Sequence, residues 1–221
     1  MNQSIDIDYM PVKTKEVFEI LSKQSFISNY TLIEGTALSI QVKHRLSEDL
    51  DFIADEETIN INSIKRNIGK IFPGYKVIRQ DDNWQIDLVV NDIKITFFST
   101  GSVAVPFNVG KHSFEYKNMK IGYTTVIASL KMAAIAQRNA IRDYYDLYWL
   151  ARYHHSLLDI ITQTKILIPA LSPITYSETL IYTEDIDEKD ISEHLKPKEV
   201  INKDQIAEYF TKELKKIKRQ I

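Results

Sequence analysis

The sequence predicts an α/β (α+β) fold, in which a small mixed β-sheet with helices is followed by a mostly helical C-terminal part. Residues 30–54 have the pattern of a strand, a turn, a helix and a second strand, and residues 84–98 that of two strands joined by a tight turn. Residues 125–152 carry apolar side chains at helical spacing. We therefore expect an α/β domain over residues 1–124 and a helical domain over residues 125–221.

The N-terminal part is predicted to contain both helices and strands. Apolar residues three and four positions apart predict helices, and short apolar or alternating runs predict strands. The predicted helices are Val12–Leu21, Ala37–Val42 and Asn60–Ile71, and the predicted strands are Tyr30–Ile33, Leu50–Ala54, Tyr75–Ile78, Trp84–Val90 and Ile93–Phe98. Asn91 and Asp92 separate the last two strands and suit a two-residue hairpin turn.

The second half of the chain is predicted to be helical after an irregular connection. Residues 101–122 contain glycine and proline in no clear period, which indicates a connection with short strands. Residues 125–152 have the strongest helical pattern in the chain and predict one long helix. Beyond residue 160 three prolines break the helical pattern, and residues 204–218 predict a final helix.

The composition is that of a globular protein with a substantial core. The 221 residues are 44% hydrophobic and include no cysteine, which excludes disulfides and thiolate chemistry. The N-terminus lacks a signal-peptide pattern and no apolar run approaches the ~18 residues of a membrane helix, so we expect a cytoplasmic protein with no membrane partner. A net charge of −2 gives no overall attraction to nucleic acid. The basic residues 212–219 indicate first a solvated helix face, and second an RNA contact.

A short strand followed by Gly35 and Thr36 forms the first part of a candidate site. A turn of small residues that opens a helix presents free backbone N–H groups and the positive end of the helix dipole. Glycine also lets a ligand approach the backbone closely. We expect Gly35 and Thr36 to bind a phosphate group.

Asp49 and Asp51 form the second part. Alternation along a strand places both carboxylates on one face and Leu50 on the other. Such a pair suits a divalent cation, Mg²⁺ or Mn²⁺, shared with the phosphates of a nucleotide. A solvated acidic edge is the alternative, but the apolar residues Phe52 and Ile53 favour a strand and therefore the metal site.

Two stretches of this region resemble a known family. Gly35-Thr36-Ala37-Leu38, followed by residues 44–52 with the sequence His-Arg-Leu-Ser-Glu-Asp-Leu-Asp-Phe, is similar to the signature of the AbiEii/AbiGii abortive-infection toxins, a branch of the DNA polymerase beta-type nucleotidyltransferases. In that superfamily a Gly-Ser or Gly-Thr turn precedes an Asp-x-Asp pair. Arg45 and Ser47 lie within the matching signature, so the resemblance implies that they contact the substrate. Glu34 departs from the family, which usually has a glycine there.

The same resemblance implies a third metal-binding carboxylate on a strand beside the Asp-x-Asp strand. Asp87, within the predicted strand Trp84–Val90, is the candidate that the sequence offers, whereas the neighbouring strand has Thr96. A site with two carboxylates alone is the alternative.

The predicted long helix carries a cationic stripe. At ~100° per residue, Lys131, Arg138 and Arg142 fall within about 20° of one another. Asp146 lies one turn beyond Arg142 and is expected to pair with it. The stripe is either the solvated side of the helix or the lining of a substrate groove, and the large apolar residues that border it favour the groove.

This helix also resembles the second signature of the toxin family. In that signature a lysine and an aspartate fifteen residues later are functional, and they correspond to Lys131 and Asp146. The resemblance therefore implies catalytic roles for these two residues, and substrate binding by Arg138 and Arg142. Asp143 is directed towards the buried face of the predicted helix and is interpreted as a structural hydrogen-bonding partner.

Together these residues imply a metal-dependent nucleotidyltransferase. The resemblance suggests that a nucleotidyl group passes from a nucleoside triphosphate to an acceptor such as the 3′ end of a transfer RNA. It also suggests the toxin of a toxin–antitoxin pair, with an antitoxin protein as partner. A metal-dependent nuclease or phosphatase is one alternative, and a non-catalytic nucleotide- or partner-binding module on the same fold is another.

Overall fold

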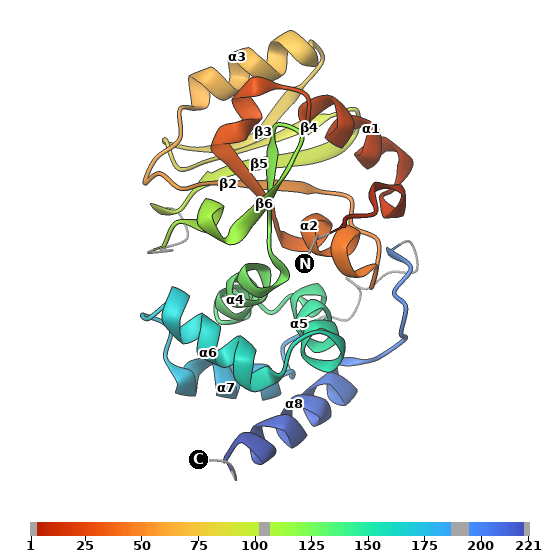
Figure 1. Ribbon diagram of the computed structural model, residues 1–221, viewed down its shortest axis with the longest axis vertical. Helices are drawn as coiled ribbons and strands as arrows, with labels where there is room; N and C mark the ends of the chain where they lie inside the picture. Colours follow the sequence, from red (N-terminus) through yellow and green to blue (C-terminus); the bar gives the residue numbers. More distant parts are fainter. Residues whose placement is uncertain (1–3, 102–106, 187–194, 219–221) are drawn as a thin grey trace. The chain divides into compact units, whose positions relative to one another are not determined.

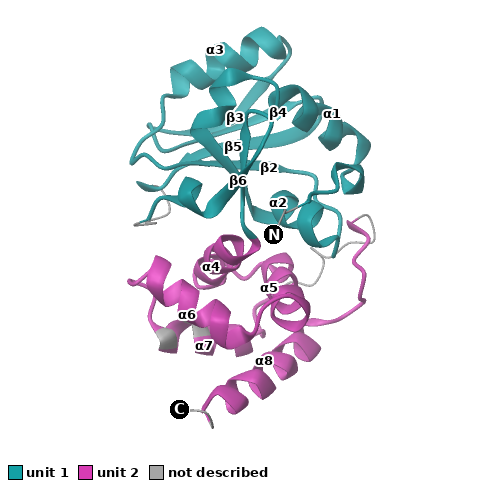
Figure 2. Ribbon diagram, viewed as in Figure 1, with its two compact units in different colours: residues 1–123 teal, residues 124–221 magenta. Residues whose placement is uncertain are grey.

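The protein consists of two compact units, residues 1–123 and residues 124–221, coloured separately in Figure 2. Its structure, a computed structural model, describes residues 4–101, 107–186 and 195–218. Arg219, the last residue of the expected basic stretch, lies outside the described residues. Across the described ranges no helix has the length and apolar character that a membrane crossing requires.

Unit 1 is built around a mixed seven-stranded sheet (Figure 1). The strands are β1 (Tyr30–Ile33), β2 (Leu50–Ala54), β3 (Lys76–Asp81), β4 (Gln85–Val90), β5 (Ile93–Ser99), β6 (Ser113–Tyr116) and β7 (Met119–Gly122). The helices are α1 (Val12–Leu21), α2 (Glu34–Val42) and α3 (Ile61–Ile71), with short 3-10 helices η1 (Ile7–Tyr9), η2 (Ser25–Asn29) and η4 (Val109–His112). The strand order is β3-β4-β5-β2-β1-β7-β6. The mixed α/β fold class predicted from the sequence is therefore confirmed.

Local patterns predicted most elements of unit 1 to within a few residues. Helix α3 begins after the N-cap Asn60, whose side chain accepts a hydrogen bond from the Ser63 N–H, and its isoleucines face the core. Asn91 and Asp92 have positive φ angles of 50° and 68°, as a type I′ hairpin turn requires. Helix α2 differs from the prediction, because it begins at Glu34 and so includes the expected turn residues Gly35 and Thr36 in its first turn.

One face of the sheet is apolar and forms the core of unit 1. Phe97 of β5 stacks on Phe52 of β2 at 5.2 Å between ring centroids, and contacts Tyr30 edge-on at 4.9 Å. Phe18 of α1 stacks on Tyr116 of β6 at 5.5 Å, which places α1 on this same face. Alternation along each strand then directs the intervening residues to the opposite face.

The opposite face carries a row of polar residues across four strands. Asp51 of β2 is in register with Thr96 of β5, Thr96 with Asp87 of β4, and Asp87 with Arg79 of β3. Residues in register on neighbouring strands point to the same side of a sheet. We call Asp51, Thr96, Asp87 and Arg79 the polar row.

Unit 2 contains helices and no strand among its described residues. Its helices are α4 (Thr124–Ile135), α5 (Ile141–Tyr153), α6 (Leu157–Leu167), α7 (Pro173–Ile181) and α8 (Lys203–Lys218). Three buried tyrosines of α5 use their hydroxyl groups to hold other segments: Tyr144 donates to the Thr179 carbonyl, Tyr145 accepts from the Glu199 N–H, and Tyr148 donates to the Glu199 carboxylate. The rings of these three tyrosines therefore contribute to the core of unit 2 while their hydroxyl groups are hydrogen-bonded.

The single helix predicted over residues 125–152 is wrong. Two helices, α4 and α5, replace it, and residues 136–140 form a non-helical connection. Ala140 has an extended backbone, with φ −90° and ψ 115°, and is the N-cap residue of α5. Asn139, which precedes it, belongs to a residue type that competes for backbone hydrogen bonds outside helices. The break contains neither glycine nor proline, and the apolar pattern continues on both sides of it, so hydrophobic periodicity does not reveal it.

Candidate active site

The junction between β1 and α2 presents backbone N–H groups without side-chain caps. Ile33 is the N-cap residue of α2 and makes no side-chain capping hydrogen bond, so the N–H groups of the first turn have no capping side chain there. Glu34 has φ 64°, the left-handed conformation that favours glycine. The glutamate noted as a departure in the sequence therefore occupies a position whose backbone conformation favours glycine.

Thr36 connects this helix start to the acidic strand. Its side chain is buried, with 1% exposure, and its hydroxyl donates a hydrogen bond to the backbone carbonyl of Asp49. The hydroxyl is therefore committed to the protein, and only the backbone N–H of Thr36 is left for the predicted phosphate contact. Thr36 thus fixes Asp49 beside the first turn of α2.

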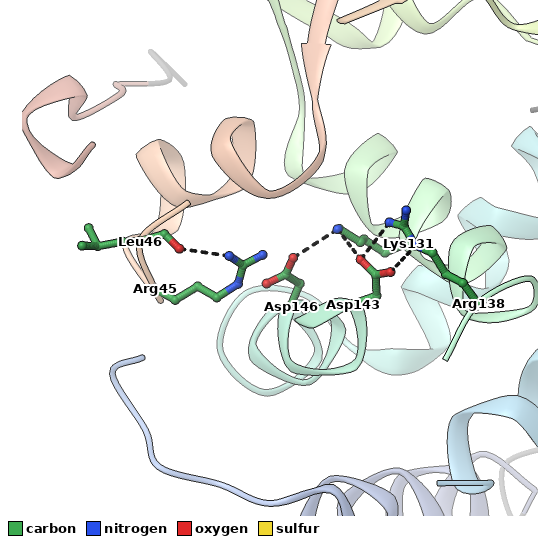
Figure 3. Close-up of polar contacts among 6 residues, drawn as sticks. All are labelled: Arg45, Leu46, Lys131, Arg138, Asp143 and Asp146. Carbon is green, nitrogen blue, oxygen red and sulfur yellow. Dashed lines mark hydrogen bonds and ion pairs between the residues drawn. The ribbon is translucent and has the colours of Figure 1, made fainter. Parts of the chain in front are cut away.

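Gly35 lies tightly against two other residues of the predicted site. A Cβ atom at Gly35 would meet Ser47 Oγ at 2.7 Å and Arg45 Nη2 at 2.8 Å, so glycine is needed for close approach. Arg45 is buried, and its Nη1 donates to the Leu46 carbonyl at 3.0 Å (Figure 3). The structure therefore brings Gly35, Arg45 and Ser47 together and adds a guanidinium charge to the positive end of the helix, while substrate contact by Arg45 and Ser47 stays a prediction.

Asp49 and Asp51 lie where β2 begins. Asp49 immediately precedes the strand, Asp51 is its second residue, and both are partly exposed. Asp51 is in register with Ile33, the N-cap residue of α2. Asp51 therefore lies at the end of the central strands where the first turn of α2 begins. That the two carboxylates share one cation stays a prediction.

The expected third carboxylate is not present as predicted. Asp87 lies on β4, which is separated from β2 by β5, so Thr96 stands beside Asp51 where the acid was expected. Asp87 accepts a hydrogen bond from Gln85 Nε2 at 2.9 Å and pairs with Lys94 Nζ at 3.3 Å. Within residues 4–101, 107–186 and 195–218, no group of three or more acidic, histidine or cysteine side chains is placed to hold a metal ion. The expectation that Asp87 joins Asp49 and Asp51 is therefore wrong.

Unit 2 contains a buried cluster of charged side chains (Figure 3). Lys131 Nζ of α4 lies 2.5 Å from Asp143 Oδ1 and 3.3 Å from Asp146 Oδ2, both on α5, and all three side chains are at most 3% exposed. Arg138, in the connection between the helices, donates from Nε to Asp143 Oδ2 at 2.7 Å. Burial acts to raise the pKa of Asp143, but the charges of Lys131 and Arg138 outweigh it and hold that pKa below its usual range.

The cationic stripe predicted from the sequence is wrong. Lys131, Arg138 and Arg142 do not share one helix, so their calculated alignment does not exist. Asp146 pairs with Lys131 rather than with Arg142. Arg142 is partly exposed, and its side chain makes no hydrogen bond or ion pair with the described part of the chain. Asp143 is the structural partner that was expected, although its role is larger, because it joins both Lys131 and Arg138.

No protein-family model matches the sequence. An uncharacterized protein of Aquifex aeolicus (strain VF5), aq_aa25, is 27% identical over 205 residues, which cover 91% of this chain and 94% of that protein.

Solved structures resemble the fold over nearly the whole chain. JHP933 from Helicobacter pylori has a TM-score of 0.59 at 17% identity and covers 98% of this chain and 96% of its own. MenT4, the nucleotidyltransferase toxin Rv2826c from Mycobacterium tuberculosis H37Rv, has a TM-score of 0.57 at 12% identity and covers 92% of this chain and 86% of its own. This chain shares their fold. At these identities the likeness concerns the arrangement of helices and strands.

Sequence reasoning did not assign a role to Thr96 and gave Asp143 a minor one. The pairing of Thr96 with Asp87 could have been predicted, since the hairpin turn at Asn91 and Asp92 sets these two residues opposite each other. The missing information was the strand order, which places β5 and not β4 beside β2. For Asp143 the sequence contained no sign of the helix break that lets Arg138 reach it.

Proposed function

We propose that this chain is a nucleotidyltransferase that moves a nucleotidyl group from a nucleoside triphosphate to an acceptor. The observation that carries the proposal is the hydrogen bond from Thr36 to the Asp49 carbonyl. This hydrogen bond connects the start of α2 to the pair of carboxylates. The uncapped N–H groups of the helix start suit a phosphate, and the carboxylates suit a divalent cation. Phosphoryl transfer needs both groups in one place.

Each residue of unit 1 has a proposed role. The backbone N–H groups of Gly35 and Thr36 donate to a phosphate, and the guanidinium of Arg45 adds positive charge beside them. Asp49 and Asp51 would hold Mg²⁺ or Mn²⁺; their two carboxylates fit such an ion because hard cations prefer oxygen ligands. When bound, that ion would neutralise charge on the transferred phosphate and on the leaving pyrophosphate.

In unit 2 the proposed contributors are cations and the carboxylates that position them. Asp143 and Asp146 hold the ammonium group of Lys131 in one place. We propose that Lys131 and Asp146 serve catalysis through this fixed charge. Arg138, whose side chain is 56% exposed, and Arg142 are the cations proposed to meet the substrate.

The acceptor that we propose is RNA, with the 3′ end of transfer RNA as the first class to test. The likeness in fold to MenT4, described as a nucleotidyltransferase toxin, supports a further proposal that this chain is the toxin of a toxin–antitoxin pair. The partners would then be a nucleoside triphosphate, the RNA acceptor and an antitoxin protein.

The test is incubation with labelled nucleoside triphosphates, Mg²⁺ and total RNA. We expect label in RNA with the native chain and none with Asp51→Asn. Asp87→Asn is the matched control, because it removes the same charge from the same face of the sheet outside the proposed site. Phosphate release without labelled RNA would favour a nuclease or phosphatase. Neither label nor phosphate would favour a binding module and contradict the proposal.

The proposed toxin role needs a separate measurement. Induced expression in bacterial cells should arrest growth, and the Asp51→Asn chain, expressed to the same level, should not. Growth arrest by both chains would contradict arrest through nucleotidyl transfer.

A further inference from the structure

The hydroxyl group of Thr96 is buried in the polar row without a hydrogen-bond partner. Thr96 is 5% exposed, and its Oγ1 makes no hydrogen bond to any described residue. A buried hydroxyl without a partner costs free energy, so most buried polar groups in proteins are bonded to protein, water or ligand. A valine would have nearly the same shape and would avoid this cost. The hydroxyl at this position therefore requires a partner that the described residues do not supply.

The neighbours of Thr96 indicate where that partner lies. On one side Asp87 is already engaged by Gln85 and Lys94. On the other side is Asp51, which is in register with Thr96 on the adjacent strand. Adjacent strands are about 4.8 Å apart, so an atom between the two side chains can contact both. The partner of the hydroxyl is thus expected on the Asp51 side.

A divalent cation meets this requirement. Mg²⁺ and Mn²⁺ bind carboxylate oxygens together with neutral oxygens from hydroxyl groups, carbonyl groups or water. The described residues provide no third acid for this site. Two carboxylates and one neutral oxygen give a ligand set whose charge of −2 balances the charge of the ion.

We propose that Thr96 supplies a hydroxyl oxygen ligand to the divalent cation held by Asp49 and Asp51. This inference rests on the proposed function, since it takes the cation site from it. It assigns to Thr96 the position at which the sequence led us to expect a carboxylate. The site then holds its cation with two acids, and its affinity for the metal is lower than that of a site with three.

The experiment is a titration of the full chain with Mn²⁺ alone, with free Mn²⁺ measured by electron paramagnetic resonance. Thr96→Val should weaken Mn²⁺ binding by about tenfold, because it removes a ligand and keeps the shape. The same variant should melt at a higher temperature than the native chain in metal-free buffer, because it removes the unsatisfied hydroxyl. Thr96→Ser should stay within about twofold of the native affinity, and Thr96→Asp should bind more tightly.

Two carboxylate variants separate this inference from the proposed function. Asp51→Asn should weaken Mn²⁺ binding by about tenfold or more, whereas Asp87→Asn should leave it unchanged. If Asp51→Asn weakens binding and Thr96→Val does not, the cation site stands and the role of Thr96 is wrong. If the native chain binds no Mn²⁺, or if Asp51→Asn binds as well as the native chain, both proposals are wrong. Weaker binding by Thr96→Asp would also overturn the role of Thr96.

Discussion

Replacing Lys131 by methionine should strongly destabilise unit 2. Lys131 pairs with two carboxylates, Asp143 and Asp146, and its side chain is 3% exposed. Methionine keeps much of the volume of lysine but removes the charge. Both carboxylates then lose their shared counter-ion inside the protein. The sequence pattern placed Lys131 on a solvated helix face or in a substrate groove, where its loss would cost little stability, and the burial of Lys131 reverses that expectation.

The size of the effect follows from the burial of the two acids. Removing one partner of a buried ion pair costs about 3–5 kcal/mol, because an uncompensated charge remains in a medium of low polarity. Asp143 keeps Arg138 as a partner, which offsets part of its loss, and Asp146, whose side chain is 0% exposed, loses its ion pair with Lys131. Since whole domains are stable by only about 5–15 kcal/mol, a change of this size is a large part of the total.

Urea unfolding followed by circular dichroism measures this cost. Asp146→Asn and the double variant Lys131→Met/Asp146→Asn complete a double-mutant cycle, and the double variant should be less destabilised than the sum of the single variants by more than about 1 kcal/mol. Lys216→Met is the matched control: Lys216 is 65% exposed and pairs with Glu213 on the surface, so its loss should change stability by about 0–1 kcal/mol.

Acid unfolding provides a second measurement on the same variant. The pKa of Asp143 is lowered in the folded chain, so its contribution is present above the unfolded pKa of about 3.9 and is lost as the pH falls through the lower folded value. Lys131→Met removes one of the charges that lower this pKa, so unfolding should begin at a higher pH. Equal unfolding curves for Lys131→Met and Lys216→Met would refute the buried cluster.

Substitutions at Gly35, Glu34 and Thr36 test the junction between β1 and α2 by urea unfolding. Gly35→Ala should lower the free energy of unfolding by about 1–3 kcal/mol because a Cβ would meet Ser47 Oγ at 2.7 Å, and a Ser47→Ala background should recover part of the loss; no recovery would contradict this contact. Glu34→Gly should raise the free energy of unfolding by up to about 1 kcal/mol, because Glu34 is in the left-handed region, whereas Glu34→Ala should not. Thr36→Val should cost about 1 kcal/mol through the lost hydrogen bond to Asp49, and Thr36→Ser should retain most of it.

The elements of unit 1 could be predicted because each has a local cause. Isoleucines at spacings of three and four define α3, and the pair Asn91 and Asp92 defines the hairpin between β4 and β5. Such patterns specify which face of an element is buried. They do not specify which strands become neighbours. For this reason Asp87 was predicted from the sequence as a third metal ligand, whereas the strand order places Thr96 beside Asp51.

The helical unit was predicted less well for a related reason. A hydrophobic pattern is an average over several turns, and a five-residue break that keeps apolar residues on both sides hardly disturbs it. The side chains around the break depend on non-local contacts: Arg138 bends back to Asp143, and Asp143 also pairs with Lys131 across the two helices. A helical wheel drawn through such a break assigns the charged residues to a face that does not exist.

The register of the sheet positions the residues of the proposed site in unit 1. A shift of β2 by one residue would direct Asp51 into the apolar face and Phe52 to the face of the polar row, so the aromatic contacts of Phe52 with Phe97 hold Asp51 on the polar side. The same register sets Asp51 opposite Ile33, where α2 begins. The hydrophobic core therefore determines the position of the carboxylate relative to the helix start. Changes in the core of β2 and β5 should alter the proposed activity before they alter the fold, because chemistry depends on the placement of Asp51 more sharply than stability does.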